Sequence, residues 1–346
     1  MSHIVITGGL GFVGLNFIAR QLIDGQHDLH LIDDLSNTEV GRLEALLDAA
    51  EVREEKDGDR SWVLGDGRRF RLTVADVRDA DVALAVVEGA RSVIHLAAQT
   101  GVPSSLVDPR TDMTQNVVGT FNYLEACRAH GVRRFVLASS AAVIGNARPQ
   151  RETARVAPIS PYGASKAAAE GYCTAYRHCF GIETVALRFS NIYGPMAYGK
   201  SSVVAAFAKR GVGGQDLVVD GSGEQTRDFL HAADLARVIA AAAETALDDD
   251  AEILGNAVHV ATGVGTSVFD VAQQIQVHLK QRQRDCEITF GPGRAADVAE
   301  SAPEVGRLTQ LCPDVSFRRL ADGLPETIDW FLANWPPAGP AGHPAQ

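Results

Sequence analysis

A tyrosine and a lysine stand four residues apart in the segment Tyr162-Gly163-Ala164-Ser165-Lys166. The alanine run that follows predicts a helix, and in a helix these two residues lie on one face. A fixed ammonium group favours phenolate over phenol, which draws the pKa of a tyrosine from about 10 towards neutrality. The spacing therefore predicts Tyr162 as a general base with Lys166 beside it.

Two serines, Ser139 and Ser140, follow a short apolar run that predicts a strand. The carboxyl ends of parallel strands form the edge at which open α/β sheets bind ligands. A serine hydroxyl at that edge can hydrogen-bond the same substrate oxygen that the tyrosine deprotonates.

A glycine-rich turn, Thr7-Gly8-Gly9-Leu10-Gly11-Phe12-Val13-Gly14, follows the first predicted strand and opens a helix. Its glycines permit a tight turn and close approach of the backbone to a pyrophosphate, and the helix N-terminus supplies amide donors. Asp33 ends the next strand about 20 residues later, where a carboxylate meets ribose hydroxyls and repels a 2′-phosphate. The pattern predicts an NAD site; the alternative is a structural turn with an incidental aspartate.

Residues at the ends of two further predicted strands are expected to contact the cofactor. Asp76, followed by Val77, can accept a hydrogen bond from the adenine amino group or cap a helix. The small residues in His95-Leu96-Ala97-Ala98 let the backbone approach the middle of the cofactor, and His95 itself is expected to be a packed core residue.

Short β-branched or leucine-rich runs alternate with longer alanine-rich stretches of helical period, which is typical of βαβ units. We predict an α/β fold, a doubly wound parallel Rossmann sheet with a smaller C-terminal α/β substrate-binding lobe. A charged hairpin with an Asp66-Gly67 turn is expected between the second and third strands. The predicted strands are His3 to Thr7, Asp28 to Asp33, Arg71 to Asp76, Ser92 to Leu96, Arg134 to Ala138 and Glu183 to Arg188.

Glycine-rich segments interrupt this rhythm after residue 190. We predict that residues 1–190 form the NAD-binding domain, to which 226–260 returns. Residues 191–225 and 261–335 are expected to form the substrate-binding lobe, and the Pro/Gly/Ala-rich residues 336–346 a mobile tail.

Composition excludes several classes of protein. The 346 residues carry a formal charge of -11, so electrostatics disfavours nucleic acids and anionic membranes as partners. The N-terminus does not resemble a signal peptide, and apolar runs stay well below the roughly 18 residues of a membrane span. The 5 cysteines lack a C-x-x-C pair and are expected to be buried free thiols. We expect a cytoplasmic protein with no metal site.

Six segments in this order, TGGLGFVG, HLAAQ, SSAAVIG, PYGASK, RFSNIYGP and GSGEQTRDF, resemble the extended short-chain dehydrogenase/reductases that modify nucleotide sugars. Within that superfamily the chain is most similar to NAD-dependent sugar-nucleotide epimerases of the UDP-glucose 4-epimerase kind. The resemblance implies that Ser140, Tyr162 and Lys166 form a catalytic triad and that Asn116 orders the site. It also implies a homodimer, formed through helices expected at Thr111 to His130 and Pro161 to Phe180, although their apolar faces can equally pack on their own sheet.

The family chemistry implies that bound NAD takes a hydride from sugar C4 while Tyr162 takes the hydroxyl proton, after which the 4-ketose turns over and receives the hydride on its other face. Arginine suits the diphosphate because its planar fork donates in pairs. The predicted cofactor-binding residues are Gly8, Gly11, Phe12, Val13, Gly14, Asp33, Asp34, Ser36, Asp76, Val77, Leu96, Ala97, Ala98, Asn116, Ser139, Tyr162 and Lys166. The predicted substrate-binding residues are Ser104, Ser140, Asn191, Val203, Val218, Arg227, Arg294 and Asp297. For Ser104 the alternative is a helix cap, and for Arg227 a surface ion pair with Asp228.

Some residues depart from the family pattern. Ala141-Ala142 follow Ser140, where nucleotide-sugar 4,6-dehydratases resemble one another in carrying an Asp-Glu pair that moves the protons of water elimination. Asp220 stands where an aromatic residue beside the nucleobase is usual, so uridine is only the default base. Ser301 leaves room for an N-acetyl or C6-carboxylate substituent, or is simply exposed.

We therefore predict an NAD-dependent epimerase of a nucleoside-diphosphate sugar, a UDP-hexose, UDP-hexosamine or UDP-uronate 4-epimerase. The alternatives are a reductase, decarboxylase or dehydratase on the same scaffold, a hydroxysteroid-type dehydrogenase, and a non-catalytic NAD-binding module.

Overall fold

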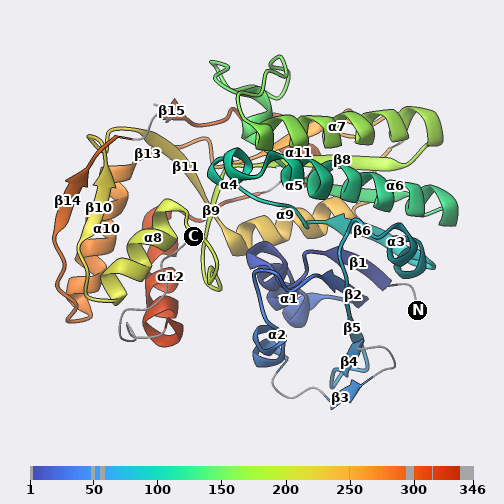
Figure 1. Ribbon diagram of the computed structural model, residues 1–346, viewed down its shortest axis with the longest axis horizontal. Helices are drawn as coiled ribbons and strands as arrows, with labels where there is room; N and C mark the ends of the chain where they lie inside the picture. The colour runs from blue at the N-terminus through green and yellow to red at the C-terminus, as the bar shows by residue number, and fades with distance from the viewer. Residues whose placement is uncertain are drawn as a thin grey trace. The chain divides into compact units, whose positions relative to one another are not determined.

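The computed structural model describes residues 3–47, 51–54, 59–248, 250–293, 300–313 and 315–335 (Figure 1). The chain divides into two compact units. The first comprises residues 1–190, 235–260 and 303–315, and the second comprises residues 191–234, 261–302 and 316–346.

The first unit is built on a 9-stranded sheet in the order β12-β8-β7-β6-β1-β2-β5-β4-β3. Neighbours from β12 to β5 are parallel, and β4 and β3 continue the sheet in antiparallel pairing. The strands are β1 (His3–Thr7), β2 (Asp28–Asp33), β3 (Glu51–Glu54), β4 (Arg60–Val63), β5 (Arg69–Val74), β6 (Ala90–His95), β7 (Arg134–Ser140), β8 (Glu183–Phe189) and β12 (Ala257–Val260).

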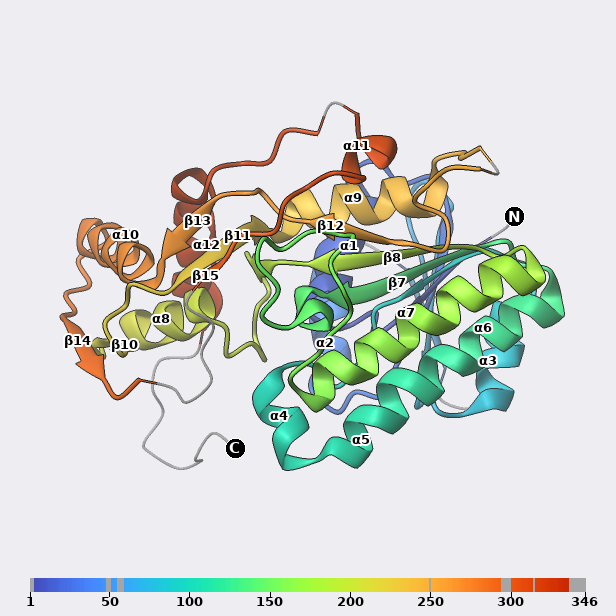
Figure 2. The same cartoon turned by 90° about the horizontal axis from the view of Figure 1, so that it is seen from above.

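Helices cover both faces of this sheet, with α3, α6 and α7 on one face and α9 on the other (Figure 2). The longer helices are α1 (Phe12–Asp24), α3 (Ala80–Val87), α6 (Gly119–His130), α7 (Pro161–Phe180) and α9 (Ala232–Glu244). The short ones are α2 (Val40–Leu46), α4 (Val102–Val107), α5 (Pro109–Met113), the π-helix η2 (Thr114–Val118), the 3-10 helix η3 (Ala141–Ile144) and α11 (Leu308–Leu311). This arrangement confirms the predicted doubly wound sheet.

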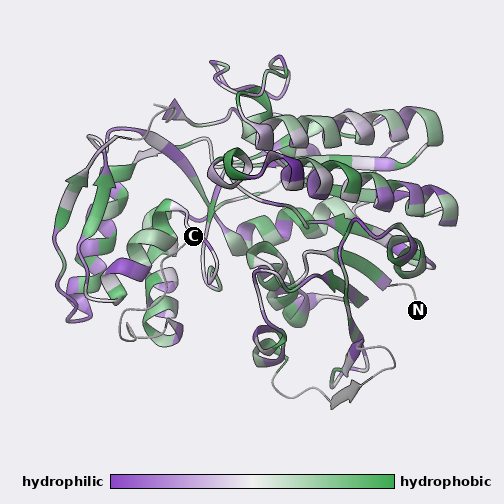
Figure 3. Cartoon of the chain, in the orientation of Figure 1, coloured by the Kyte–Doolittle hydropathy of each residue, from purple (hydrophilic) through white to green (hydrophobic). Residues whose placement is uncertain are grey.

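The central strands are apolar on both faces because helices cover both. Ile4, Val5 and Ile6 of β1 are fully buried, as are Phe135 and Leu137 of β7. Figure 3 shows β1 as hydrophobic. Continuous apolar runs of this kind are typical of parallel strands, and they leave the strand ends to carry polar chemistry.

In its described residues, the second unit contains two small sheets and three helices. Strands β10 and β14 pair in parallel, while β11 lies beside β9, β13 and β15. The elements are β9 (Asn191–Tyr193), α8 (Val203–Val212), β10 (Leu217–Asp220), β11 (Thr226–His231), β13 (Gly265–Ser267), α10 (Val268–Gln281), β14 (Ile288–Gly291), β15 (Glu300–Ser301) and α12 (Leu320–Asn334).

The predicted hairpin is present. β4 pairs antiparallel with β5, and the turn closes through a hydrogen bond from the Gly67 amide to the Leu64 carbonyl, with Gly67 at φ 86. The prediction missed β3, which extends the hairpin by one strand. It was also wrong in expecting every thiol to be buried, because Cys179 is exposed while Cys127 and Cys173 are buried.

The chain passes between the two units at other residues than those predicted from the sequence. Residues 226–234 belong to the second unit, where β11 pairs with β9, and 303–315 belong to the first. The 303–315 segment is held there by two backbone amides: that of Glu304 donates to the Gln150 carbonyl (2.8 Å), and that of Arg307 donates to the Glu152 carboxylate (3.0 Å). Residues 336–346, the predicted tail, lie outside the described residues. In the part of the chain that is described, no helix is both long and apolar enough to cross a membrane.

Candidate active site

The turn between β1 and α1 is shaped by its glycines. Gly8 adopts φ +65, and a Cβ there would lie 2.7 Å from the Ala97 amide nitrogen. A Cβ on Gly14 would collide with the backbone carbonyl of Gly9. Helix α1 begins after Gly11 with no side-chain cap, so its first-turn amides are offered to an anionic ligand. The turn fits the pyrophosphate of a dinucleotide.

Asp33, at the end of β2, is buried beside this turn. Its two carboxylate oxygens accept hydrogen bonds from the amides of Leu10 and Leu35, each at 3.0 Å. Burial raises the pKa of Asp33, and these two backbone hydrogen bonds act against that rise. The next carboxylate, Asp34, accepts from the Ser36 hydroxyl at 2.6 Å. Asp33 therefore holds the glycine turn in place through its hydrogen bond with Leu10. It lies where the ribose of a dinucleotide is expected.

Other predicted cofactor residues line up along the same strand ends. The Leu96 and Ala97 amides donate to the Thr7 backbone oxygen and hydroxyl, which keeps Leu96-Ala97-Ala98 against the turn. Asp76 forms an ion pair with Arg78, whose guanidinium donates to both carboxylate oxygens and lowers the Asp76 pKa. Val77 is buried, and a Cβ on Gly119 would lie 2.8 Å from its side chain.

The predicted core histidine is confirmed. His95 is fully buried, and its Nδ1 lies 2.9 Å from the Thr7 hydroxyl. Burial lowers the pKa of His95 to about 3, so the ring is neutral and packs between aromatic neighbours.

Tyr162 stands in the first turn of α7. Ser160 caps this helix by accepting from the Gly163 amide at 3.1 Å, and Pro161 starts it with a pre-set φ. Gly163 packs so closely on η3 that a Cβ there would lie 2.5 Å from the Ala142 carbonyl oxygen. This contact brings Tyr162 to the end of β7, where the Ser140 side chain is close enough to lower the pKa of its phenol.

Lys166 lies one turn further along α7 and is only 3% exposed. Its ammonium group donates to the Ala138 carbonyl at 2.9 Å. Burial lowers the pKa of Lys166 to about 8, while the carboxylates of Asp112 and Glu170 act in the opposite direction. The structure therefore brings Ser140, Tyr162 and Lys166 together.

The predicted pKa of Tyr162 was wrong in direction. Burial raises it to about 12, the Ser140 hydrogen bond lowers it, and the Asp112 carboxylate raises it further. Lys166 points its charge at the Ala138 carbonyl, which explains why the lysine alone does not produce a phenolate.

Asn116 lies in the π-helix η2, a local irregularity that often marks functional sites. Its side chain binds the Gln99 backbone at both ends, accepting from the amide (2.9 Å) and donating to the carbonyl (3.1 Å). It also donates to the Ser165 hydroxyl at 2.9 Å and to Asp112 at 3.2 Å. Asn116 thus joins the loop after β6 to the helix that carries Tyr162.

The predicted substrate residues fall in both units. In the first, the Ser104 hydroxyl donates to the Thr100 and Gly101 carbonyls of its own helix start. In the second, Asn191 of β9 donates to the Asp228 carbonyl at 3.3 Å, next to Arg227 on the paired strand β11. Val203 begins α8 and Val218 lies in β10. Arg294 and Asp297 lie outside the described residues.

Arg227 is oriented by the strand that carries it. One guanidinium nitrogen donates to the Thr226 carbonyl at 2.7 Å. The Asp228 carboxylate is fully buried and accepts from the Thr262 amide and hydroxyl and from the Val264 amide, so loop 262–264 engages both of its oxygens. Ser301 lies directly beside Arg227 on β15.

Sequence reasoning missed three buried charged groups around the triad. Asp112 accepts a hydrogen bond from Asn116. Glu170 forms an ion pair with Arg188 and accepts a hydrogen bond from the Ser139 hydroxyl. Two signals were available: Glu170 follows Lys166 at helical spacing in an alanine-rich stretch, and Arg188 interrupts an apolar strand.

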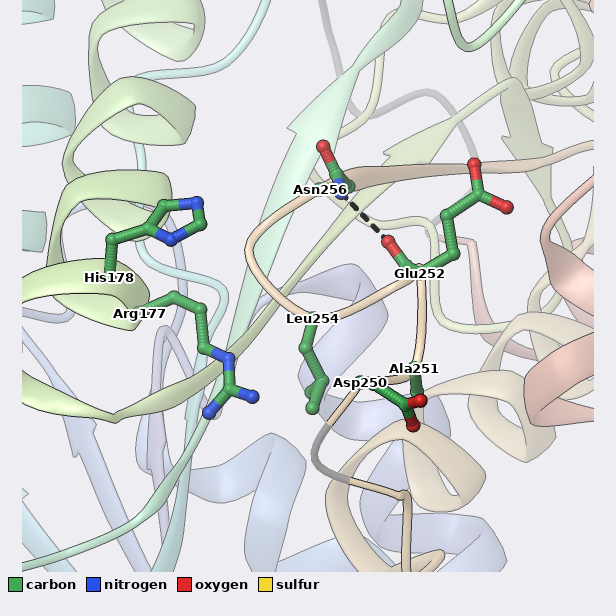
Figure 4. Close-up of a pocket in the computed structure, with 7 residues that line it drawn as sticks. All are labelled: Arg177, His178, Asp250, Ala251, Glu252, Leu254 and Asn256. Carbon is green, nitrogen blue, oxygen red and sulfur yellow. Dashed lines mark hydrogen bonds between the residues drawn. The ribbon is translucent and has the colours of Figure 1, made fainter.

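A pocket of about 500 Å³ in the first unit lies away from these groups (Figure 4). None of the predicted site residues that the structure describes lines it. Its lining residues are Arg177, His178, Asp250, Ala251, Glu252, Leu254 and Asn256.

A glycine turn built for a dinucleotide, next to a serine-tyrosine pair and a buried lysine, defines a dehydrogenase-like enzyme of the Rossmann class. The chain belongs to the NAD dependent epimerase/dehydratase family, whose profile matches residues 4–255. It is accordingly an NAD-dependent enzyme that acts on nucleotide sugars.

Known relatives cover the chain almost completely. A UDP-glucose 4-epimerase of Mycolicibacterium smegmatis is 33% identical over 336 residues, 94% of this chain and 97% of the relative. A dTDP-glucose 4,6-dehydratase of Streptomyces niveus is 30% identical over 348 residues, 97% of this chain and 95% of the relative. The structure of Thermus thermophilus UDP-glucose 4-epimerase in complex with NAD superposes with a TM-score of 0.76 at 27% identity, covering 96% and 99% of the two chains.

Proposed function

We propose that this enzyme is a nucleoside-diphosphate-sugar epimerase, a UDP-hexose, UDP-hexosamine or UDP-uronate 4-epimerase that works through a 4-keto sugar and returns the hydride internally. The nearness of the Ser140 and Tyr162 side chains carries the proposal, because it places two hydroxyl groups where they can share one substrate oxygen. The similarity to a UDP-glucose 4-epimerase supports the choice of substrate class.

The proposed roles follow from the geometry. Tyr162 takes the proton of the sugar 4-hydroxyl and returns it, and Ser140 holds that oxygen in place. Lys166 keeps a positive charge in the buried site. NAD, when bound to the turn at Gly8 to Gly14, supplies a reversible hydride acceptor and the positive charge of its nicotinamide ring. Burial raises the pKa of Tyr162 to about 12. A positive charge beside the phenol favours the phenolate and therefore acts against this rise.

The proposed grip on the diphosphate uses Asn191 and Arg227, whose backbone segments are paired strands. Arginine remains charged at any working pH and donates in a fork that matches phosphate oxygens. Val203, Val218 and the residues at 294 and 297 remain predicted contacts of the nucleoside or phosphates.

Proton NMR in deuterated water tests the proposal, with purified protein, NAD and a panel of nucleotide sugars. The panel contains UDP-glucose, UDP-galactose, their N-acetyl forms, UDP-glucuronate, and CDP, GDP and dTDP analogues. We expect a new C4 epimer with no deuterium in its carbon skeleton. Deuterium at C3 or C5 would favour another reaction on the same scaffold, and no turnover of any sugar in the panel would favour a binding module without catalysis.

A 4,6-dehydratase is the second candidate, because a dehydratase is among the relatives. Water elimination needs an acid and a base besides the tyrosine. In this chain, Ala141 and Ala142 form η3 directly after Ser140, where the dehydratases carry their Asp-Glu pair. Release of water from dTDP-glucose would overturn the epimerase proposal.

The pH profile of turnover is expected to fall on the alkaline side. Lys166 has its pKa lowered to about 8 by burial, so its charge is present below that pH and lost above it. If that charge supports the phenolate, kcat/KM declines as the pH rises through about 8. Steady-state rates between about pH 6 and 10 provide the measurement, and a profile that stays flat to the alkaline end would contradict a role for the lysine charge.

A homodimer through α6 and α7 is also proposed. Phe121, Tyr172 and Phe180 are 38%, 40% and 52% exposed on these adjacent helices, and the Phe121 and Tyr172 rings lie 5.6 Å apart. Exposed aromatic groups of this kind are typical interface anchors.

The double variant Phe121→Glu/Tyr172→Glu is expected to be monomeric by light scattering after size exclusion, because it places charges in the proposed interface. Ile23→Glu, at an 83% exposed site on α1, serves as the control and leaves the dimer intact. A monomeric wild type, or a double variant that still dimerises, would refute this interface.

A further inference from the structure

Three consecutive residues at the end of β7 each bind one residue of α7. The Ala138 carbonyl accepts from Lys166 (2.9 Å), the Ser139 hydroxyl donates to Glu170 (2.5 Å), and Ser140 binds Tyr162. The three α7 residues are spaced by one helical turn and share a face. Helix α7 packs on both β7 and β8 (Figure 2). We call these three contacts the α7 rungs.

Glu170 also contacts strand β8 through Arg188. Arg188 donates to the Glu170 carboxylate through Nε (2.9 Å) and Nη2 (2.8 Å), and through Nη1 to the Glu152 carbonyl (3.2 Å). Arg188 lies opposite Ser139 in the strand register. Glu170 is 8% exposed and Arg188 is 3% exposed, so the forked pair is buried.

A buried ion pair is a poor way to gain stability, because desolvation of both charges offsets their attraction, and apolar side chains of similar size often hold a core as well or better. A forked arginine-carboxylate pair does fix distance and direction in a way that apolar packing does not. Its effect here is to define how far α7 can slide along β7.

We propose that Glu170 and Arg188 are positioning residues that set the register of α7 on β7, and thereby hold Tyr162 at Ser140 and Lys166 at Ala138. Neither residue needs to touch substrate for this role. The activity readout rests on the proposed function, whereas the structural readout below does not.

The main test is the double variant Glu170→Gln/Arg188→Met, which removes both charges and leaves no unpaired one behind. We expect kcat to fall about 100-fold, the loss that a displacement of about 1 Å can cause, while NAD affinity and the KM for the nucleotide sugar stay near wild type. The melting temperature is expected to stay close to wild type, since a neutral pair can replace a buried ionic one.

A matched control uses a second arginine-glutamate pair, which joins β7 to β8. Arg134 and Glu183 are paired at 2.7 Å at the opposite ends of β7 and β8, far along the strands from Ser140. Glu183→Gln/Arg134→Met removes that pair, together with the contact of Glu183 to the exposed Arg133, and is expected to keep kcat. A control that loses as much kcat as the test variant would overturn the proposal.

Ser139→Ala provides an independent test, because it removes the hydrogen bond from Ser139 to Glu170 and leaves the ion pair between Glu170 and Arg188 intact. It is expected to lower kcat with little change in the melting temperature. Wild-type kcat in a folded Glu170→Gln/Arg188→Met protein, or in Ser139→Ala, would refute the positioning role.

Crystal structures of the wild type and of the double variant give a readout that needs no substrate. We expect the wild type to keep the Lys166–Ala138 contact at hydrogen-bond distance and the variant to lose it together with the Ser140–Tyr162 contact. An unchanged register in the variant would refute the proposal even if no nucleotide sugar is turned over. If the variant loses the register and the wild type turns over no nucleotide sugar, the positioning proposal stands and the proposed epimerase function is rejected.

Discussion

Replacing Tyr162 with phenylalanine is expected to lower turnover by about 10²- to 10⁴-fold, the usual contribution of a positioned general acid or base. The ring keeps its packing at the start of α7, so only the phenol that meets Ser140 is lost. NAD affinity should stay near wild type, because the glycine turn and Asp33 are untouched. Steady-state kinetics and calorimetric NAD binding measure the two effects.

Tyr172→Phe is the control for this variant, since it removes a phenol from a partly exposed site on the same helix. It should keep full activity. A Tyr162→Phe enzyme with wild-type turnover would overturn the role of Tyr162 as the base, and a variant that also loses NAD would indicate a structural defect.

The second large effect is expected for Gly14→Ala. The added methyl group collides with the backbone of Gly9 and Gly8, and a backbone carbonyl cannot move aside without opening the turn. We expect a loss of about 1 to 3 kcal/mol in the free energy of unfolding, typical of overpacking. We also expect NAD affinity to fall at least about 10-fold, because the amides that face the pyrophosphate move.

Gly41→Ala is the matched control. A Cβ on Gly41, in α2, meets nothing within 4 Å, so this change is expected to raise the free energy of unfolding by about 0.4 to 1 kcal/mol through loss of backbone freedom in the unfolded chain. Calorimetry for NAD binding and thermal unfolding for stability separate the two glycines. Gly14→Ala with wild-type NAD affinity would contradict the assignment of this turn to the cofactor.

The sequence was informative where chemistry is set by local spacing. The glycine turn, the aspartate after β2, and the Tyr162–Lys166 spacing all lie in elements whose order could be predicted from apolar periodicity. The strand ends then had to meet at one edge, because parallel strands share it.

The sequence was uninformative where the outcome depends on burial and on distant partners. The pKa of Tyr162 rises because the folded chain desolvates the phenol, a property that no local motif carries. The pairing of Glu170 with Arg188 joins a helix to a strand, and it emerges only when both pack on β7. The ion pair of Asp76 with Arg78 could not be predicted either, and the contact of Asp76 with adenine stays a prediction.

The discontinuous first unit has a consequence for synthesis of the protein. Strand β12 completes the sheet beside β8, and it lies more than 60 positions later in the chain, as Val258 pairs with Leu187. Until the ribosome has released that segment, β8 is an unpaired sheet edge with an apolar centre, Val185 to Leu187, and unpaired edges of this kind invite pairing between nascent chains. The final segment, at 303–315, emerges later still. Fast translation or premature termination should therefore convert newly made protein into aggregates, and chaperones that shield strand edges should raise its yield.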